Sequence, residues 1–273
     1  MIGVGITTRN RPEILDYALG WFAKFQDRNQ DILVVDDNSD IDVHETLGEK
    51  YPHISFMYNQ ERLGIAKSKN ELIKGFLDTG WEYDGFVLFD DDAFPTQEGW
   101  YEHFLRARKN HNQQHMIFAK EPQIVLESSR EYADIWCGCL GVCVWLTPYA
   151  VQRIGGWDPR FKRYGMEHHE LTRRCYLAKL SPLGLYVSPK DISDYIWCFD
   201  TNGDHVSCDC GWNGKYIESC PECGDPLILN EDGFKWPHKG CMTKEERDEA
   251  IAENGKIFVE IKNEKKENLF RKI

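Results

Sequence analysis

The chain has 273 residues, of which 41% are hydrophobic and 29% charged, a balance that is typical of globular proteins and excludes general disorder. Its 33 basic residues against 45 acidic ones give a net charge of −12, which disfavours a protein that binds polyanions over its whole surface. No apolar run approaches the roughly 20 residues of a membrane-spanning helix, and the N-terminus lacks a signal-peptide pattern, so we expect a cytoplasmic protein.

Strands and helices are expected to alternate along the first 120 residues. Short apolar runs predict strands within Ile2–Thr8, Asp31–Asp40, His53–Asn59 and Asp84–Pro95. Apolar residues at helical spacing predict helices over Pro12–Phe25 and Gly64–Gly80. This alternation is typical of an α/β fold with a mostly parallel sheet flanked by helices, in which ligands bind at the carboxyl ends of the strands.

The rest of the chain is expected to be less regular. Short helices are predicted at Tyr149–Phe161 and Glu167–Leu180, and a cysteine-rich segment follows them. The charged C-terminal tail is expected to be partly helical and solvated. The predicted organisation is a main domain, an insertion and this tail: residues 1–200, with halves 1–120 and 121–200, then 201–241, then 242–273.

Polar clusters end three of the predicted strands, at Thr7–Arg11, Asp36–Ser39 and Asp90–Asp92, and we expect them to meet in one crevice. The three adjacent carboxylates of the last cluster would repel one another. A divalent cation would relieve this repulsion, because hard cations prefer carboxylate oxygens. A solvated acidic turn is the alternative explanation of the triplet. The apolar strand before it and the aspartate pair at another strand end favour the cation site.

Four segments in this order, ITTRNRP, VVDDNSD, ERLGIAKSKN and FDDD, resemble the nucleotide-sugar domain of the GT-A glycosyltransferases, especially family 2. IGGWDPRF and YGMEHHELTRR are similar to a later segment of those enzymes and of the galactosyltransferases. The resemblance covers residues 2–188 and implies a Rossmann-like GT-A fold. It also implies a Mn²⁺- or Mg²⁺-dependent transfer of a sugar from a nucleotide sugar, by default a UDP-sugar, to a hydroxyl acceptor.

The resemblance implies roles for individual residues. Asp90 and Asp92 match the pair that binds the metal and, through it, the diphosphate, and His205 is the candidate for a third metal ligand. Either Asp36 or Asp37 matches the residue that contacts the base. The other residues implied to line the nucleotide are Thr7, Arg9, Arg11, Lys67, Asn70, Asp90 and Asp91. An exposed helix lysine is the alternative explanation for Lys67.

The segment EHHE, Glu167–Glu170, matches the part of the family pattern that holds the general base of inverting members. Glu167 and His168 are both candidates, because His168 stands where an aspartate is common and an imidazole is a competent base at neutral pH. A charged first helical turn is the alternative explanation. A base implies one in-line displacement with inversion, whereas its absence would open a retaining mechanism. Arg173 and Arg174 are expected to be structural.

All ten cysteines follow residue 136, and four of them crowd into the segment from Cys208 to Cys223. The spacing CxC…CxxCG predicts a zinc-ribbon-like insertion whose ligands are Cys208, Cys210, Cys220 and Cys223, with His205, His238 and Cys241 as substitutes. Disulfides, free thiols or an iron centre are the alternatives. We expect small buried apolar side chains at Cys137, Cys139, Cys143, Cys175 and Cys198.

The acceptor is left open between a glycan, a protein, a small molecule and a modified DNA base, the last as in phage-type transferases. A bacterial or phage source is expected. Two other functions compete with sugar transfer. One is a nucleotidyltransferase, which ITTRNRP disfavours because it lacks a glycine-rich loop. The other is a non-catalytic binding module with a zinc ribbon on a degenerate transferase fold.

Overall fold

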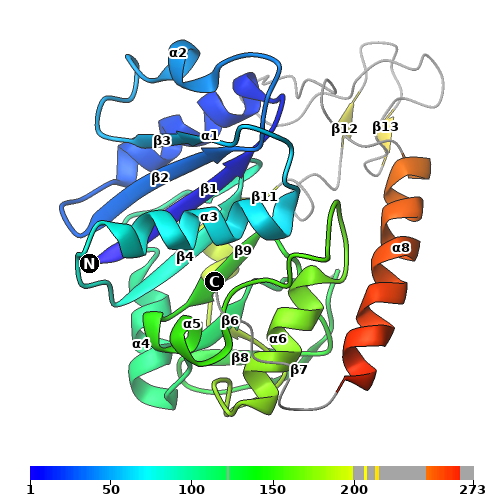
Figure 1. Ribbon diagram of the computed structural model, residues 1–273. Coiled ribbons are helices and arrows are strands. Elements are labelled where there is room, and N and C mark those ends of the chain that lie inside the picture. The colour runs from blue at the N-terminus through cyan, green and yellow to red at the C-terminus, as the bar shows by residue number, and fades with distance from the viewer. Residues whose placement is uncertain (122, 199–205, 208–212, 215–243, 265–273) are drawn as a thin grey trace.

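The computed structural model describes residues 1–121, 123–198, 206–207, 213–214 and 244–264. Its centre is a six-stranded sheet in the order β3-β2-β1-β4-β9-β6 (Figure 1). The first four strands in this order are parallel, and β9 runs antiparallel to both of its neighbours. Their bounds are β1 Ile2–Thr8, β2 Gln30–Asp36, β3 Ser55–Tyr58, β4 Gly85–Asp90, β6 His115–Ile117 and β9 Cys143–Leu146. The predicted α/β class with a mainly parallel sheet is therefore confirmed.

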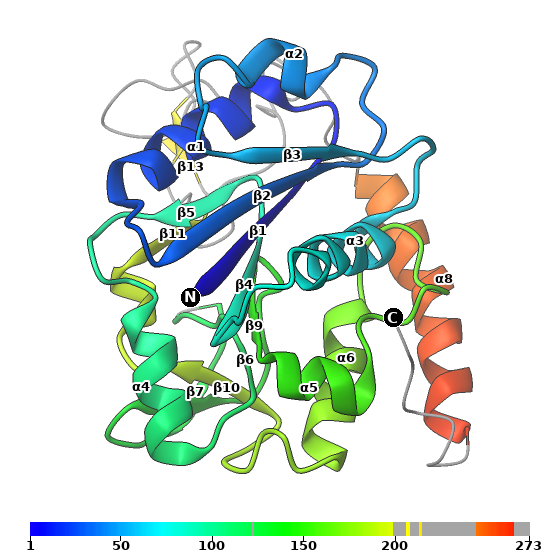
Figure 2. The ribbon, with the colours of Figure 1, turned by 60° about the vertical axis from the view of Figure 1, so that its left-hand side comes forward.

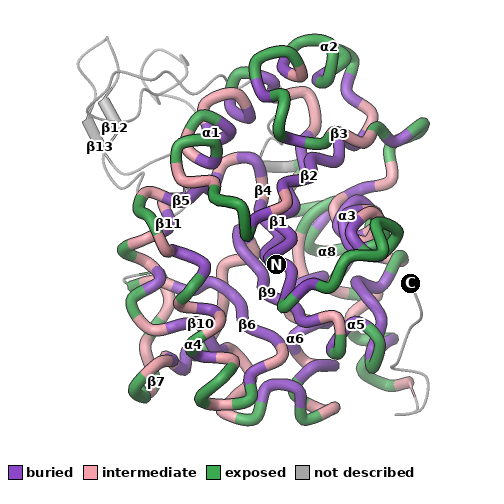
Figure 3. The backbone as a smooth tube through the Cα atoms, turned by 90° about the vertical axis from the view of Figure 1, so that its left-hand side faces the viewer, coloured by how far each residue is buried: buried purple, intermediate pink, exposed green. Residues whose placement is uncertain are grey.

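Helices cover both faces of this sheet (Figure 2). Alternate side chains of β4 pack on opposite faces of the sheet, because successive residues of a strand point to opposite sides. Val87 and Phe89 pack with α1, whereas Phe86 and Leu88 pack with α3. The central strands are consequently buried almost throughout (Figure 3). The helices are α1 Pro12–Phe25, α2 Val43–Leu47, α3 Ile65–Asp78, α4 Glu102–His111, α5 Pro148–Ile154, α6 Glu167–Leu177 and α8 Lys244–Asn263, with a 3₁₀ turn, η1, at Ile192–Asp194.

The second half of the chain also forms smaller sheets beside the central one. A three-stranded antiparallel sheet has the order β10-β8-β7, and β5 pairs with β11 directly after the three aspartates. The sequence did not predict β5, because AFP is too short to give a period. The bounds are β5 Ala93–Pro95, β7 Leu126–Ser129, β8 Ala133–Trp136, β10 Tyr186–Pro189, β11 Ile196–Cys198, and the paired β12 Val206–Ser207 and β13 Asn213–Gly214.

The C-terminal tail differs from its prediction. It forms the 20-residue helix α8, as the helical part of the prediction required. The expectation that it is solvated holds for most of its described residues but not for one side of the helix, where Ala250, Asn254 and Ile261 are buried and Ile261 joins the core beneath α3, α5 and α6. Within the described part of the chain, no helix combines the length and the apolar character that crossing a membrane requires.

Candidate functional site

The three polar strand ends lie at one edge of the central sheet. The parallel register places Thr8 beside Asp36 and Thr7 beside Asp90. The Oγ1 atom of Thr8 donates a hydrogen bond to Asp91 over 2.6 Å. The expected convergence of these segments is therefore present, and it follows from the shared direction of β1, β2 and β4.

Arg11 binds two carboxylates of the acidic turn after β4, those of Asp91 and Asp92. Its guanidinium donates two hydrogen bonds to the fully buried carboxylate of Asp91 and one, over 3.1 Å, to Asp92. Burial raises the pKa of Asp91 to about 7 against the opposing charge of Arg11, and it raises the pKa of Asp92 as well. The Asp91 side chain is fully buried and bound to Thr8 and Arg11, and its predicted place along the nucleotide stays a prediction. Asp92 keeps 23% of its side chain exposed at the crevice.

Asp90 is neutralised by a lysine that the sequence interpretation did not place in the site. The Nζ atom of Lys69 lies 2.9 Å from Asp90 Oδ1, and the lysine side chain is fully buried. The same Nζ lies 5.9 Å from the centroid of the Trp157 ring. Helical spacing could have found it, since Ala66, Lys69 and Ile73 stand three and four residues apart on the buried face of α3.

The two adjacent aspartates after β2 have different environments. Asp37 accepts hydrogen bonds from Asn59 and from the backbone N–H groups of Leu63 and Gly64, so its carboxylate holds the loop that enters α3. Asp36 accepts from Ser39 through Oδ1 only, and its buried Oδ2 has no hydrogen-bond partner within the described residues. Burial raises the pKa of Asp36 against these hydrogen bonds. Asp36 is therefore the member of the pair with an unused acceptor atom.

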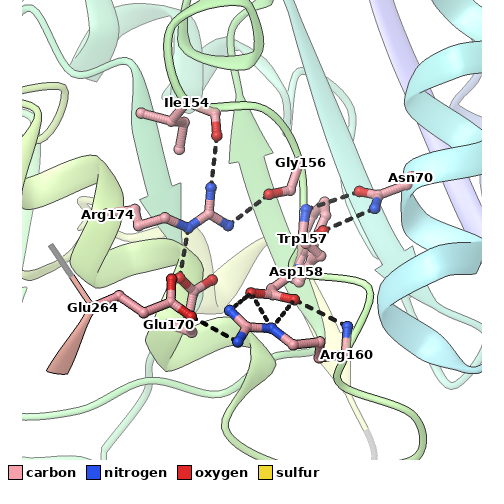
Figure 4. Close-up of polar contacts among 9 residues, drawn as sticks. All are labelled: Asn70, Ile154, Gly156, Trp157, Asp158, Arg160, Glu170, Arg174 and Glu264. Atoms are coloured by element: carbon pink, nitrogen blue, oxygen red, sulfur yellow. Dashed lines mark hydrogen bonds and ion pairs between the residues drawn. The ribbon is translucent and has the colours of Figure 1, made fainter. Parts of the chain in front are cut away.

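The remaining residues predicted to line the nucleotide fall into two groups. Thr7 and Arg9 lie at the carboxyl end of β1 and Lys67 in the first turn of α3, and the Nε atom of the half-buried Arg9 has no partner in the described part of the chain. Asn70 instead exchanges two hydrogen bonds, of 2.9 and 2.8 Å, with the backbone of Trp157 (Figure 4). Its amide thus joins α3 to the loop before α6, and both its nitrogen and its oxygen are used in these hydrogen bonds.

Glu167 and His168 form a connected pair at the first turn of α6. The Nε1 atom of Trp157 donates to His168 Nδ1 over 3.3 Å. An indole N–H can only donate, so Nδ1 is the acceptor nitrogen and the neutral imidazole carries its proton on Nε2. This Nε2 lies 3.3 Å from Oε1 of Glu167. The other carboxylate oxygen, Oε2, is buried and has no hydrogen-bond partner among the described residues.

The electrostatics assign different chemistry to the two side chains. Burial raises the pKa of Glu167 to about 7, and backbone hydrogen bonds and the charge of Lys69 oppose that rise only in part. Burial, together with the charge of Lys69, lowers the pKa of His168 well below its ordinary value. His168 is therefore neutral near pH 7, and its only acceptor nitrogen, Nδ1, already accepts the indole N–H of Trp157. Glu167 has an unoccupied oxygen and a proton affinity suited to accepting a proton at neutral pH.

Gly141 leaves room for His168. A methyl group at Gly141 would lie 2.2 Å from Cδ2 and 2.5 Å from Nε2 of the imidazole. We expect Gly141→Ala to displace His168 and to lower the free energy of unfolding by about 1–3 kcal/mol through overpacking. Urea denaturation followed by tryptophan fluorescence measures this change. Gly138→Ala is the control, because its methyl group would come no closer than 3.5 Å to any neighbour and should leave the stability nearly unchanged.

Arg174 ties α6 to the loop that carries Trp157 (Figure 4). Its fully buried guanidinium donates to Glu170 over 2.6 Å and to the carbonyl oxygens of Ile154 and Gly156. The expected structural role of Arg174 is confirmed by these contacts. Asp158 and Arg160 form a second ion pair in the same loop.

We expect Arg174→Met to lower the free energy of unfolding by about 3–5 kcal/mol, because it leaves the buried Glu170 charge uncompensated. The loss of donors to two backbone carbonyls acts in the same direction. Arg173→Met, on the half-buried side of the same helix, is the matched control. Equal urea midpoints for the two variants would contradict the structural importance of Arg174.

The predicted ligands His205, Cys208, Cys210, Cys220 and Cys223 lie outside the described residues, so the zinc-ribbon prediction stays a prediction. In the described ranges, no three His, Cys, Asp or Glu side chains are grouped so that they could hold a metal. Of the six other cysteines, Cys241 also lies outside the described residues, and Cys137, Cys139, Cys143 and Cys175 are free thiols. Cys143, Cys175 and Cys198 are buried as expected, but Cys139 is only half-buried and Cys137 is exposed, because it follows the last residue of β8.

Comparisons with known proteins bear on the fold and the class of enzyme. No protein-family model matches the chain. A curated relative, the "Uncharacterized glycosyltransferase R363" of Acanthamoeba polyphaga mimivirus, is 29% identical over 196 residues, which cover 66% of this chain and 75% of the relative.

Two solved structures share the fold at low sequence identity. S. aureus TarS is 18% identical with a TM-score of 0.50, and the match covers 64% of this chain and 33% of TarS. GalNAc-T7, solved with UDP, GalNAc and Mn²⁺, is 13% identical with a TM-score of 0.50 over 63% of this chain and 39% of its own. The chain thus spans between a third and two fifths of these proteins. The matches show a glycosyltransferase fold and, with the curated relative, confirm an enzyme of the glycosyltransferase class.

Proposed function

We propose that the chain is a metal-dependent, inverting glycosyltransferase that moves a sugar from a nucleotide sugar, with UDP-sugars as the first candidates, to a hydroxyl acceptor. The observation that carries the proposal is the buried Glu167, whose free Oε2 and raised pKa suit a general base. Asp90 and Lys69 both act electrostatically on this carboxylate, which places it beside the acidic end of β4. The UDP and Mn²⁺ bound to GalNAc-T7 support the choice of donor and metal.

The charges at the end of β4 fit a divalent cation. Four carboxylates, Asp90, Asp91, Asp92 and Glu167, are opposed by the cationic side chains of Lys69 and Arg11. When all of them are ionised, two negative charges are left over in this group, which a divalent cation would balance. Asp90 and Asp92 would hold it, because carboxylate oxygens suit Mn²⁺ and Mg²⁺. When bound, such a cation supplies Lewis-acid stabilisation of the charge on the leaving diphosphate.

The protein's own residues then account for the proton and the orientation. Oε2 of Glu167 accepts the proton of the acceptor hydroxyl while that oxygen forms its bond to the anomeric carbon. The bond from this carbon to the diphosphate oxygen breaks in the same step, with inversion at the carbon. The imidazole of His168, whose Nε2 lies 3.3 Å from Oε1, packs against the carboxylate and limits its movement. On the nucleotide side, the free Oδ2 of Asp36 is the proposed acceptor for an N–H group of the base. Positioning of this kind supplies much of the rate acceleration.

The proposal is tested by a thermal-shift panel of UDP-glucose, UDP-GlcNAc, UDP-galactose and GDP-mannose, each with and without Mn²⁺. A ligand that binds only the folded state raises the melting temperature. We expect a manganese-dependent rise with one donor, followed by release of its nucleoside diphosphate on turnover. No shift with any nucleotide would contradict the proposal and favour a non-catalytic binding module.

We also propose a structural zinc ion held by the thiolates of Cys208, Cys210, Cys220 and Cys223. Metal analysis of the purified full chain should give about one zinc per chain, and chelation should lower its melting temperature, because binding of a structural zinc contributes to folding. A chain that is folded and free of zinc would contradict the site.

A further inference from the structure

The helix α8 packs beside α6 although the two are far apart in the sequence (Figures 1 and 2). Ile261 of α8 belongs to the same buried cluster as Leu171 and Cys175 of α6. Glu264, directly after α8, forms an ion pair of 2.7 Å with Arg160 (Figure 4). The helix is therefore joined to the loop that leads into α6 as well as to α6 itself.

One buried polar side chain of α8 holds the last turn of that loop. The Nδ2 atom of Asn254 donates to the carbonyl oxygens of Tyr164 and Gly165 over 3.1 and 2.9 Å. Asn254 is only 3% exposed, so both N–H bonds of its amide serve these carbonyls away from competing water. Ile251, three residues earlier on the same helix, approaches Gly165 so closely that a methyl group there would lie 2.9 Å from its Cγ1.

This turn needs outside support because its backbone is strained. Gly165 has φ of 94° and Met166 has φ of 71°. The left-handed conformation costs a residue with a side chain, such as Met166, on the order of 1–3 kcal/mol and persists only where neighbours enforce it. The side chain of Met166, the N-cap residue, makes no capping hydrogen bond to α6, which begins at the next residue, Glu167. The direction of the turn thus sets where the Glu167 carboxylate lies.

We propose that Asn254 is a positioning residue for the general base. Its amide fixes the left-handed turn at Gly165 and Met166, and this turn holds Glu167 against the Nε2–H group of His168 with Oε2 free. The inference rests on the proposed function, in which Glu167 accepts the acceptor's proton.

The proposal is tested by two measurements on the full-length Asn254→Ala variant. The first is hydrogen–deuterium exchange of the backbone amides in residues 164–170, which reports on the turn without any donor. The second is kcat and KM for release of the nucleoside diphosphate from the donor found in the panel, with water as the acceptor. The controls are Glu253→Ala, on the exposed face of α8, and Ile261→Ala, which weakens the packing of α8 but leaves the Asn254 hydrogen bonds in place.

We expect Asn254→Ala to speed exchange in 164–170 and to lower kcat about tenfold with KM unchanged. Glu253→Ala should change neither quantity, and Ile261→Ala should lower the melting temperature without this loss of kcat. Gly165→Ala disturbs the same turn from the side of Ile251 and should reproduce the effect if Asn254→Ala fails to fold.

Three results would overturn the inference. They are unchanged exchange in Asn254→Ala, faster exchange with full kcat, and an equal loss of kcat in Ile261→Ala, which would indicate general weakening of α8. A fourth such result is full turnover in Glu167→Gln, because Glu167 would then not be the general base that Asn254 is proposed to position. If the wild-type chain binds no donor, the proposed function fails instead. The exchange measurement needs no donor, so it still shows whether Asn254 holds the turn at Gly165 and Met166.

Discussion

Glu167→Gln is expected to lower the rate of sugar transfer by about 10²–10⁴-fold, the usual contribution of a general base. Glutamine has nearly the same shape and can still contact His168, but it has no basic oxygen. Binding of the nucleotide sugar should change little, because the proposed donor contacts lie at the ends of β1, β2 and β4. The measurement is kcat and KM for nucleoside diphosphate release, with donor binding followed separately by thermal shift.

The pH dependence of the wild-type rate follows from the same group. Only the ionised carboxylate accepts a proton, and burial raises the pKa of Glu167 to about 7. The rate should therefore rise with pH, pass half of its maximum near pH 7 and level off above it. A rate already at its plateau at pH 5 would contradict the assignment.

The stability of Glu167→Gln provides a control against misfolding. The folded-state pKa of Glu167 lies above its ordinary value, so the folded state holds the proton more tightly than the unfolded state. The stability that this group contributes is complete at low pH and is lost as the pH rises from about 4.5 to about 7. Glu167→Gln should consequently be at least as stable as the wild type at pH 8, where its loss of turnover is measured.

His168→Ala separates the two candidate bases that the sequence left open. In the structure Nε2 of His168 lies 3.3 Å from Oε1 of Glu167 without accepting or transferring the acceptor's proton, so removing the imidazole should loosen the carboxylate and lower kcat less than Glu167→Gln does. If His168 were the base, its removal would abolish turnover while Glu167→Gln stayed active. The two variants therefore give opposite orders of activity under the two assignments.

Sequence reasoning located the segments of the site because local patterns determine them. Apolar runs fixed where β1, β2 and β4 end, and parallel pairing then brought Thr8, Asp36 and Asp90 to one edge. Contacts between distant residues decided the rest. Arg11 and Asp91 are 80 residues apart, and Asn254 and Gly165 are 89 apart, so no local period carries either pairing.

Sequence reasoning also could not tell which lysine at the start of α3 lies beside Asp90. The resemblance points to Lys67 at the start of α3, but the orientation of the helix against the sheet buries the ammonium of Lys69 beside Asp90. The choice between Glu167 and His168 depends likewise on Trp157, whose indole comes from the preceding loop and fixes the imidazole tautomer.

The second large loss of turnover is expected from a substitution in the acidic turn after β4. We expect Asp92→Ala to lower turnover by at least about 10²-fold, because a catalytic metal supplies several kcal/mol of transition-state stabilisation. Asp92 keeps 23% of its side chain exposed, close to the 25% of Asp90, whereas Asp91 is fully buried against Thr8 and Arg11. The manganese-dependent part of the donor-induced thermal shift should disappear in the same variant.

Asp91→Asn is the matched control, because it removes a neighbouring carboxylate that does not reach the crevice. It should lower the melting temperature, since Arg11 loses its buried partner, yet the activity that remains should still depend on manganese. Asp92→Ala should show the converse, a folded protein whose residual activity no longer responds to the metal. Full manganese-dependent turnover in Asp92→Ala would exclude Asp92 as a metal ligand, and the charge excess around Lys69 and Arg11 would then have to be balanced by a cation bound elsewhere or by protonation of Asp91.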